Sequence, residues 1–403
     1  MADNAAEGLL IDQLADWLMG EALDGGSALT EVLDGCCQRL RAAGVPVTRA
    51  YLSFRTLHPL FSAMALTWRN GAAVEVDRFG SGPDSPRLSA AFRASPHHSM
   101  LLHKLPLLRR RLAGRDAMLD YPILKDLADQ GATDYLAFLI GFNPKRDDGV
   151  LGSWTTDRPG GFTDGELRAL QRVQRRLAVA CKVSIREQII ENVAGAYLGP
   201  DAGARVLDGQ IKRGDGRSIS AALLYSDLRD STQFADRLPP VAYLALLNSY
   251  FECTAGAVID GGGEVLALSG DGVLGVFEIG PGGPAAACAA ALAAAGSAQQ
   301  RLAALNAQRR AEGAEALAFG IGLHVGEVLH GNIGVPQRLN FTVVGVAVNE
   351  AQRLEALTRS LERPVLATAA FSAHLPDHRW RPLGAHVLRG VAAPVDILAP
   401  EPS

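Results

Sequence analysis

The sequence contains no long hydrophobic run and no excess of positive charge. Its 403 residues carry a formal net charge of −4 at pH 7, so we expect no nucleic-acid partner and no attraction to an anionic membrane. The stretch "AAACAAALAAAG" (residues 285–296) is too short and too weakly hydrophobic to cross a bilayer, and it predicts a packed helix. The N-terminal "MADNAAEGLLIDQ" has no basic region ahead of an apolar one, so we expect no signal peptide.

Cysteine is also scarce, and no two cysteines have the spacing of a CxxC pair. The five are scattered along the chain: Cys36, Cys37, Cys181, Cys253 and Cys288. Such a set is typical of reduced, buried thiols in a cytoplasmic protein. The alternative is a redox or metal site at Cys36 and Cys37.

Residues 1–180 are predicted to form one α+β domain. Apolar residues recur at helical spacing over residues 9–18 and 29–40. Strand-like segments follow: "RAYLSF", "SAMALTWRNG", "EVDRFG", "DYLAFLIGF" and "GVLGSWTT". The order helix, strands, helices, strands and a final long helix resembles a GAF-like sensory domain closed by "GSWTTDRPGGFTDGELRAL", which implies an unknown small-molecule effector.

A long helix is predicted from Glu166 to about Tyr197. Thr163 and Glu166 have capping-box spacing at its start. Apolar residues then recur at steps of three and four from Leu167 to Ile189. This seam either pairs with its own copy in a dimer or docks onto the preceding domain.

Residues 181–215 are predicted to form a helical linker and a joint rich in glycine and charge. From residue 216 to residue 403 the pattern alternates between strands and helices. Such alternation predicts a second domain in which helices pack on a sheet.

Two aspartates in this second domain stand at unusual places. "ALLYSDLRDST" (residues 222–232) ends a buried strand on Asp227 and then starts a helix, whose free N–H groups favour phosphate. In "LSGDGVLGVF", two strand-like runs flank Gly270-Asp271-Gly272. Asp271 by itself would be a turn former. If the hairpin lies beside the strand of Asp227, the two carboxylates suit two Mg²⁺ or Mn²⁺ ions and displacement at phosphorus.

Further candidates follow nearer the end of the chain. "NFTVVGVAVNEAQRLEAL" predicts a strand, a glycine break and a helix on which Asn349 and Arg353 share a face. An amide and a guanidinium there can position a ribose and neutralise charge developing on a phosphate. "HVLRGVAAPVDIL" places Arg389 at a strand-to-turn junction, where it is a further candidate phosphate contact.

Residues from about 218 to 398 resemble the class III nucleotidyl cyclases, the catalytic domains of adenylate and guanylate cyclases. The motifs that carry the resemblance follow in order: "YSDLRDST", "LSGDGVLGVF", "GIGLHVGEVLHGNIG", "FTVVGVAVNEAQRLE" and "LRGV". The joint "YLGPDAGARVLDGQIKRGDG" resembles the linker before cyclase domains in proteobacterial proteins. The resemblance implies an α+β domain with a ferredoxin-like (βαββαβ) core.

The resemblance also implies a homodimer with composite active sites. Asp227 and Asp271 of one chain would hold two divalent ions, while Asn349 and Arg353 of the partner subunit would orient the ribose and stabilise the pentacovalent phosphorus. The 3′-oxygen of ATP would attack the α-phosphate, giving cyclic AMP and pyrophosphate. The backbone N–H groups expected to hold the β- and γ-phosphates are those of Leu228, Arg229, Asp230, Ser231 and Thr232.

The base-reading positions depart from the family pattern. Adenylate cyclases usually carry a Lys four residues before the second metal Asp, where this chain has Ala267, and the other base-reading position is Thr342. The Glu and Cys pair typical of guanylate cyclases is absent too. Losing a buried hydrogen-bonding partner costs about 1–3 kcal/mol, which weakens base discrimination. We therefore expect ATP as the substrate, with GTP or a pyrimidine triphosphate as the alternative.

Two other kinds of protein share part of this pattern. A non-catalytic module that binds nucleotide or only dimerises would show damaged metal or transition-state positions, and all four are intact. A polymerase-type palm domain would share the paired carboxylates but gives no reason for Asn349 and Arg353 on one helix.

In the N-terminal half, one interpretation of "RTLHP" and of the histidines His97, His98 and His103 is a haem or metal site. The alternative is that these are ordinary surface or hydrogen-bonded histidines. Regulation would follow if a rotation of the paired long helices opened or closed the composite sites.

Overall fold

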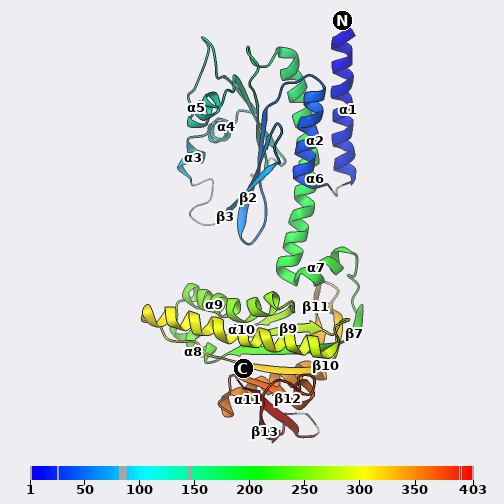
Figure 1. Ribbon diagram of the computed structural model, residues 1–403, viewed down its shortest axis with the longest axis vertical. Helices are drawn as coiled ribbons and strands as arrows, with labels where there is room; N and C mark the ends of the chain where they lie inside the picture. The colour runs from blue at the N-terminus through cyan, green and yellow to red at the C-terminus, as the bar shows by residue number, and fades with distance from the viewer. Residues whose placement is uncertain are drawn as a thin grey trace. The chain divides into compact units, whose positions relative to one another are not determined.

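The computed structural model describes residues 2–24, 27–80, 89–143, 148–389, 391 and 393–401. The chain divides into two compact units, Met1–Ala196 and Tyr197–Ser403 (Figure 1). Within the described ranges, no helix is both long enough and apolar enough to cross a membrane.

The described part of the N-terminal unit is built on a six-stranded antiparallel sheet with the order β3-β2-β1-β6-β5-β4. The strands are β1 (Arg49–Arg55), β2 (Phe61–Arg69), β3 (Glu75–Gly80), β4 (Leu107–Arg111), β5 (Asp134–Gly141) and β6 (Gly149–Thr156). The helices are α1 (Ala2–Asp24), α2 (Leu29–Ala42), α3 (Ala90–Arg93), α4 (Pro96–His103), α5 (Pro122–Asp129) and α6 (Asp164–Leu198). Every helix and strand that the sequence predicts for this unit is present. The helices α3 to α5 lie between the two sets of strands, where helices were expected without bounds, whereas β4 was not predicted.

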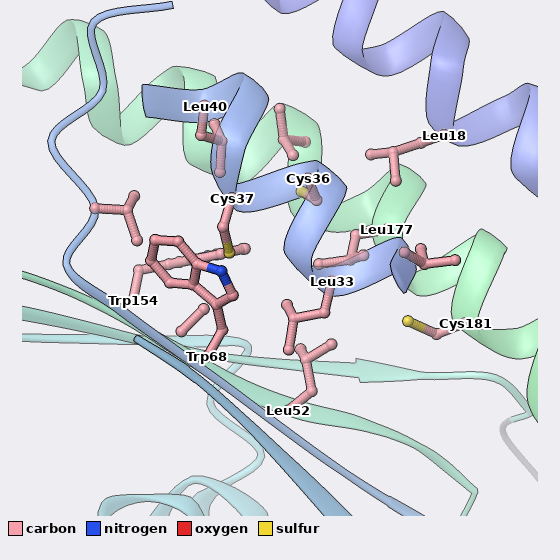
Figure 2. Packing of buried hydrophobic residues seen from close by; sticks show 14 of the residues in the cluster. Leu18, Leu33, Cys36, Cys37, Leu40, Leu52, Trp68, Trp154, Leu177 and Cys181 are labelled. Carbon is pink, nitrogen blue, oxygen red and sulfur yellow. The ribbon is translucent and has the colours of Figure 1, made fainter. Parts of the chain in front are cut away.

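One face of this sheet shares a hydrophobic core with α1, α2 and α6 (Figure 2). In that core Trp68 and Trp154 are fully buried, and the Trp68 Nε1–H donates to Asp34 Oδ1 of α2 at 2.6 Å. Cys36 and Cys37 lie there too, and burial raises the pKa of both thiols, so both stay protonated. This bears out the prediction of buried, reduced cysteines.

The long helix begins with the predicted capping box. The Thr163 N–H donates to Glu166 Oε2 at 2.7 Å, and the Glu166 N–H donates to Thr163 Oγ1 at 3.3 Å. Its apolar seam belongs to the core just described, with five buried members: Leu170, Val173, Leu177, Cys181 and Ile185. Of the two alternatives for the seam, the structure therefore shows docking onto the preceding domain.

The C-terminal unit begins with α7 (Pro200–Leu207) and then forms a sheet with the order β13-β14-β12-β10-β7-β9-β8, with β11 paired to β10. Its first part is β7 (Gly216–Leu228), α8 (Ser231–Arg237), α9 (Pro240–Asp260), β8 (Glu264–Ser269), β9 (Gly272–Glu278), α10 (Gly283–Ala311) and β10 (Phe319–Val335). The strand order β10-β7-β9-β8, antiparallel throughout, is that of a βαββαβ ferredoxin-like core, as predicted. The remaining elements are β11 (Arg338–Val344), α11 (Val346–Ser360), β12 (Val365–Thr368), α12 (Ala369–Ser372), β13 (Trp380–His386) and β14 (Val395–Pro400).

Helices cover both faces of this second sheet. Ala222 and Leu224 of β7 pack in one cluster with α9 and α10. Ala221 and Leu223 point to the other face and pack with Ala351 of α11. Successive residues of a strand point to opposite faces, and both faces are covered here, so β7 carries a nearly continuous apolar run. The run ends at the polar residues Ser226 and Asp227.

Candidate active site

Asp227 lies at the end of β7, beside the turn that carries Asp271. In the β7–β9 pairing, Asp227 is opposite Gly272. The strands β8 and β9 are joined by the two-residue turn Gly270-Asp271, in which Gly270 has φ of +64°, a conformation that glycine adopts without steric cost. The two carboxyl groups are within hydrogen-bonding reach of each other. The structure thus brings together two residues that are far apart in the sequence.

A third carboxyl group, that of Glu355 on α11, belongs to the same cluster. Burial raises the pKa of Asp227 to about 7, helped by its hydrogen bond to Asp271 and by the charges of Asp271 and Glu355. Burial likewise raises the pKa of Glu355 to about 7, while Thr358 and the Arg229 guanidinium act in the opposite direction. Such a cluster favours a bound cation, which would stabilise the charged forms.

Glu355 was not among the site residues predicted from the sequence. The feature that indicates it is its position four residues after Ala351, which places a charged side chain on the helix stripe that packs against the sheet. Gln352 on the same helix donates from Nε2 to the Tyr225 hydroxyl at 3.2 Å, which ties α11 to β7.

The aspartate pair fits a magnesium or manganese site that a substrate completes. In the described part of the chain, no group of three or more His, Cys, Asp or Glu side chains is arranged to hold a metal ion by itself. Mg²⁺ commonly takes one or two protein carboxylates and fills its shell with water and substrate phosphates. Asp227 and Asp271 supply hard oxygen ligands of this kind.

The predicted phosphate-binding segment, Leu228 to Thr232, turns from β7 into α8. The Arg229 N–H donates to the Ala318 carbonyl at 2.9 Å, so this N–H is already engaged. Asp230 has φ of +59° and accepts from the Arg359 guanidinium at 2.9 Å. The N–H groups that have no partner within their own helix therefore begin at Ser231, the first residue of α8.

Asn349 and Arg353 lie on α11, on the face turned away from its own sheet. The buried stripe of the helix is Ala347, Ala351, Leu354 and Thr358. At 100° per residue, Asn349 and Arg353 both lie about 160° from Ala351. Within the described residues, no hydrogen bond or ion pair joins either side chain to the aspartate pair. One chain therefore assembles the carboxylates and, separately, the amide and guanidinium.

The orientation of α11 is fixed by a buried histidine. His324 of β10 contacts Glu350, the neighbour of Asn349, with Nε2 2.8 Å from Oε2, and its Nδ1 lies 3.0 Å from Thr368 Oγ1. Burial lowers the pKa of His324, although Glu350 acts in the opposite direction. A neutral ring that donates from Nε2 to the carboxylate and accepts at Nδ1 from the Thr368 hydroxyl satisfies both contacts.

The two positions predicted to read the base, Ala267 and Thr342, are neighbours in the structure. Thr342 of β11 donates from Oγ1 to the Leu266 carbonyl of β8 at 3.3 Å, directly before Ala267. Arg389 is exposed in the turn after β13, next to Leu388, which is buried in one cluster with Leu354 of α11. The structure thus pairs Ala267 with Thr342 and leaves Arg389 at the surface.

Residues 216–378 match the sequence model of the adenylate and guanylate cyclase catalytic domain. Adenylate cyclase 1 of Rhizobium meliloti is 29% identical over 175 residues, which are 43% of this chain and 26% of that protein. The adenylate cyclase of Anabaena cylindrica is 30% identical over 169 residues, which are 41% of this chain and 32% of that protein. The chain thus spans about a third or less of the length of these two relatives.

Among solved structures, the adenylyl cyclase CyaB from P. aeruginosa is 26% identical, with a TM-score of 0.44 over 47% of this chain and 97% of that chain. The family match lies wholly within the C-terminal unit and contains both aspartates as well as Asn349 and Arg353. Residues 216–378 of the C-terminal unit are therefore similar to the catalytic domain of adenylate and guanylate cyclases.

Proposed function

We propose that the protein is an adenylate cyclase that converts ATP to 3′,5′-cyclic AMP and pyrophosphate at the interface of a homodimer. The observation that supports this best is that, within one chain, the metal-binding candidates lie apart from the two residues expected to act on the transition state. Asp227 and Asp271 meet at the strand ends, whereas Asn349 and Arg353 face outward from α11. Two copies would each supply the half that the other lacks, in line with the symmetric interfaces of homodimers.

Each group has a defined task in the proposed reaction. Two divalent cations, Mg²⁺ or Mn²⁺, would be held by Asp227 and Asp271 and would supply Lewis acidity. The ribose 3′-oxygen forms a bond to the α-phosphorus, the bond to the bridging oxygen breaks, the hydroxyl proton leaves to solvent, and pyrophosphate departs. Arg353 of the partner subunit would stabilise the developing negative charge, and Asn349 of the partner subunit would orient the ribose.

A second candidate substrate, GTP or a pyrimidine triphosphate, is favoured by one observation. Ala267 occupies the position of the adenine-reading Lys, and its neighbour Thr342 already donates to a backbone carbonyl. The two positions therefore hold no charged group that reads the base. A non-catalytic module is the further alternative, disfavoured because all four catalytic and metal positions keep their chemistry.

For the N-terminal unit we propose a GAF-like sensory role that regulates the cyclase in response to a small molecule. The six-stranded antiparallel sheet with a helical core on one face supports it. All five cysteines are free and buried, which supports the proposal of a cytoplasmic protein.

The test is to incubate the purified chain with each of the four ribonucleoside triphosphates and Mn²⁺ and to identify the products by mass spectrometry. Cyclic AMP is expected; a different cyclic nucleotide would establish the alternative substrate. Asp227→Ala should abolish turnover. Asp236→Ala, an exposed aspartate of α8, is the matched control and should keep it. No product from any triphosphate would favour the non-catalytic module.

A further inference from the structure

The N-terminal unit contains a cavity of about 590 Å³ on the sheet face opposite the helical core. Alternate residues of β1, namely Arg49, Tyr51 and Ser53, line it, while Ala50 and Leu52 of the same strand are buried and do not. Residues of α3, α4 and α5 complete the wall. The volume lies within the range of small-molecule sites.

A cationic group lies in this cavity without a directly paired carboxylate. Arg49 is partly buried, and its guanidinium stands 5.4 Å from the centre of the Tyr51 ring. No carboxylate among the described residues forms an ion pair with it. Burial lowers the pKa of Arg49, and the charge of Arg69 acts in the same direction, whereas the more distant charge of Glu75 acts against both.

Neutral polar groups surround this cation. Tyr135 of β5 is buried and makes a side-chain hydrogen bond with Ser153 of β6. His97 of α4 stacks on Tyr51 with ring centroids 5.7 Å apart, and its Nε2 lies 3.1 Å from the Gly152 carbonyl. Burial lowers the pKa of His97 to about 4, so the ring is neutral at physiological pH and donates from Nε2. These groups supply hydrogen bonds without adding charge.

The other charged groups of the lining lie apart from Arg49 or have partners. Asp148 pairs with Arg186 of α6 at 3.0 Å, and Asp126 is exposed. Arg55 is exposed and lies six residues along β1, roughly 20 Å from Arg49 at the rise of a strand. Arg55 is too far away to share one small anion with Arg49, and Arg69, which lies opposite Arg49 on β2, is paired with Glu75 at 2.7 Å. The polar end of the cavity therefore suits a single negative charge.

The rest of the lining is mainly aromatic and aliphatic, including Phe79, Phe92, Leu101, Leu139 and Leu151. A planar guanidinium favours a carboxylate, which it can bind through two parallel hydrogen bonds. We propose that this cavity binds a small monocarboxylic acid with an apolar body, its carboxylate on Arg49 and its body against the aromatic and aliphatic wall. This inference rests on the sensory role proposed above and names the chemical class of its ligand, and its test measures binding rather than turnover.

The experiment uses the purified full-length chain and matched acid and amide pairs: phenylacetate with phenylacetamide, indole-3-acetate with indole-3-acetamide, and octanoate with octanamide. Binding is measured by isothermal titration calorimetry at pH 7. At least one acid should bind about tenfold or more tightly than its amide, because a hydrogen-bonded charge would be lost in the amide. Phenyl phosphate and inorganic phosphate should bind more weakly than that acid.

Variants connect the preference to the guanidinium. Arg49→Gln should abolish the preference for acid over amide, while Arg175→Gln, an exposed arginine of α6, should keep it. If Arg49→Gln fails to fold, Arg49→Lys serves instead: it should bind the acid several-fold more weakly and the amide unchanged. The proposal is overturned if no acid binds, if acid and amide bind equally, if phosphate binds better, or if the Arg49 variant keeps the full preference.

Discussion

The two units of the chain use similar layers but differ in where their polar groups lie. In the C-terminal unit, both faces of the β7 region are packed by helices, and the acidic cluster lies where strands end. In the N-terminal unit, one sheet face packs on α1, α2 and α6, whereas the other packs a smaller cluster with α4 and α5 and also encloses a cavity lined by Arg49. A site at strand ends places polar residues directly after apolar runs, so it can be recognised as a sequence motif. A cavity on a sheet face changes only every second residue of a strand, and such alternation is also typical of an ordinary half-buried strand.

The largest effect is expected in the C-terminal unit. Arg353→Ala should lower the rate of cyclic nucleotide formation about 10²- to 10³-fold, because it removes a group that would stabilise charge in the transition state. Acid binding by the N-terminal unit should not change. Turnover is measured by mass spectrometry, with Arg381→Ala, an exposed arginine of β13, as the control. Near-wild-type turnover would remove Arg353 from the active site.

In the N-terminal unit, the largest effect is expected on the free energy of unfolding. Leu177→Ala should lower the free energy of unfolding of this unit by about 3 kcal/mol, because Leu177 is fully packed in its core. Val179 on the same helix is 42% exposed, so Val179→Ala should change little. Chemical denaturation followed separately for the two units checks this. Equal effects of both substitutions would mean that the seam is not core.

A smaller effect is expected on the pH dependence of the stability of the N-terminal unit. Because the pKa of His97 is lowered to about 4 in the folded state, the unfolded chain binds more protons between pH 4 and 6.5. The contribution of His97 to the free energy of unfolding is therefore fully present above about pH 6.5. It falls on acidification, by about 2 kcal/mol between pH 7 and pH 5. Urea unfolding of the N-terminal unit at both pH values measures it. His97→Asn should remove this contribution, whereas His98→Asn should retain it.

The smallest expected effect concerns base choice. Ala267→Lys should raise the preference for ATP over GTP about tenfold, because it restores a charged donor beside Thr342. The preference is read from the ratio of kcat/KM values. Leu268→Lys, at an exposed neighbouring position, is the control. A preference that stays the same in Ala267→Lys would show that the base lies elsewhere.

Periodicity predicted the elements of both units where it was strong, including α6 with its capping box, and the family resemblance implied the βαββαβ order. Helices between the two sets of N-terminal strands were expected without bounds, and β4, which has five residues, was not predicted. The β8–β9 turn was expected around Gly270-Asp271-Gly272, and the structure places its two central residues at Gly270 and Asp271. The positive φ of Gly270 is what fixes this register.

Two features of the sites depend on how elements far apart in the sequence pack together. Glu355 joins the aspartates only because α11 lies across the sheet, and His97 is buried by its contact with Gly152 rather than by any neighbour in sequence. For His97 the ordinary hydrogen-bonded histidine was the correct alternative. Among the described residues, neither the histidines nor the paired cysteines form a metal cluster.

The central claim is that each active site is shared between two chains, and complementation tests it most directly. Asp227→Ala and Asn349→Ala chains, each inactive alone, are mixed in equal amounts and allowed to exchange. Half of the dimers then contain one intact site, so about a quarter of wild-type activity should return. If tagged chains show that mixed dimers form and yet no activity returns, the sites are not shared and the account is wrong.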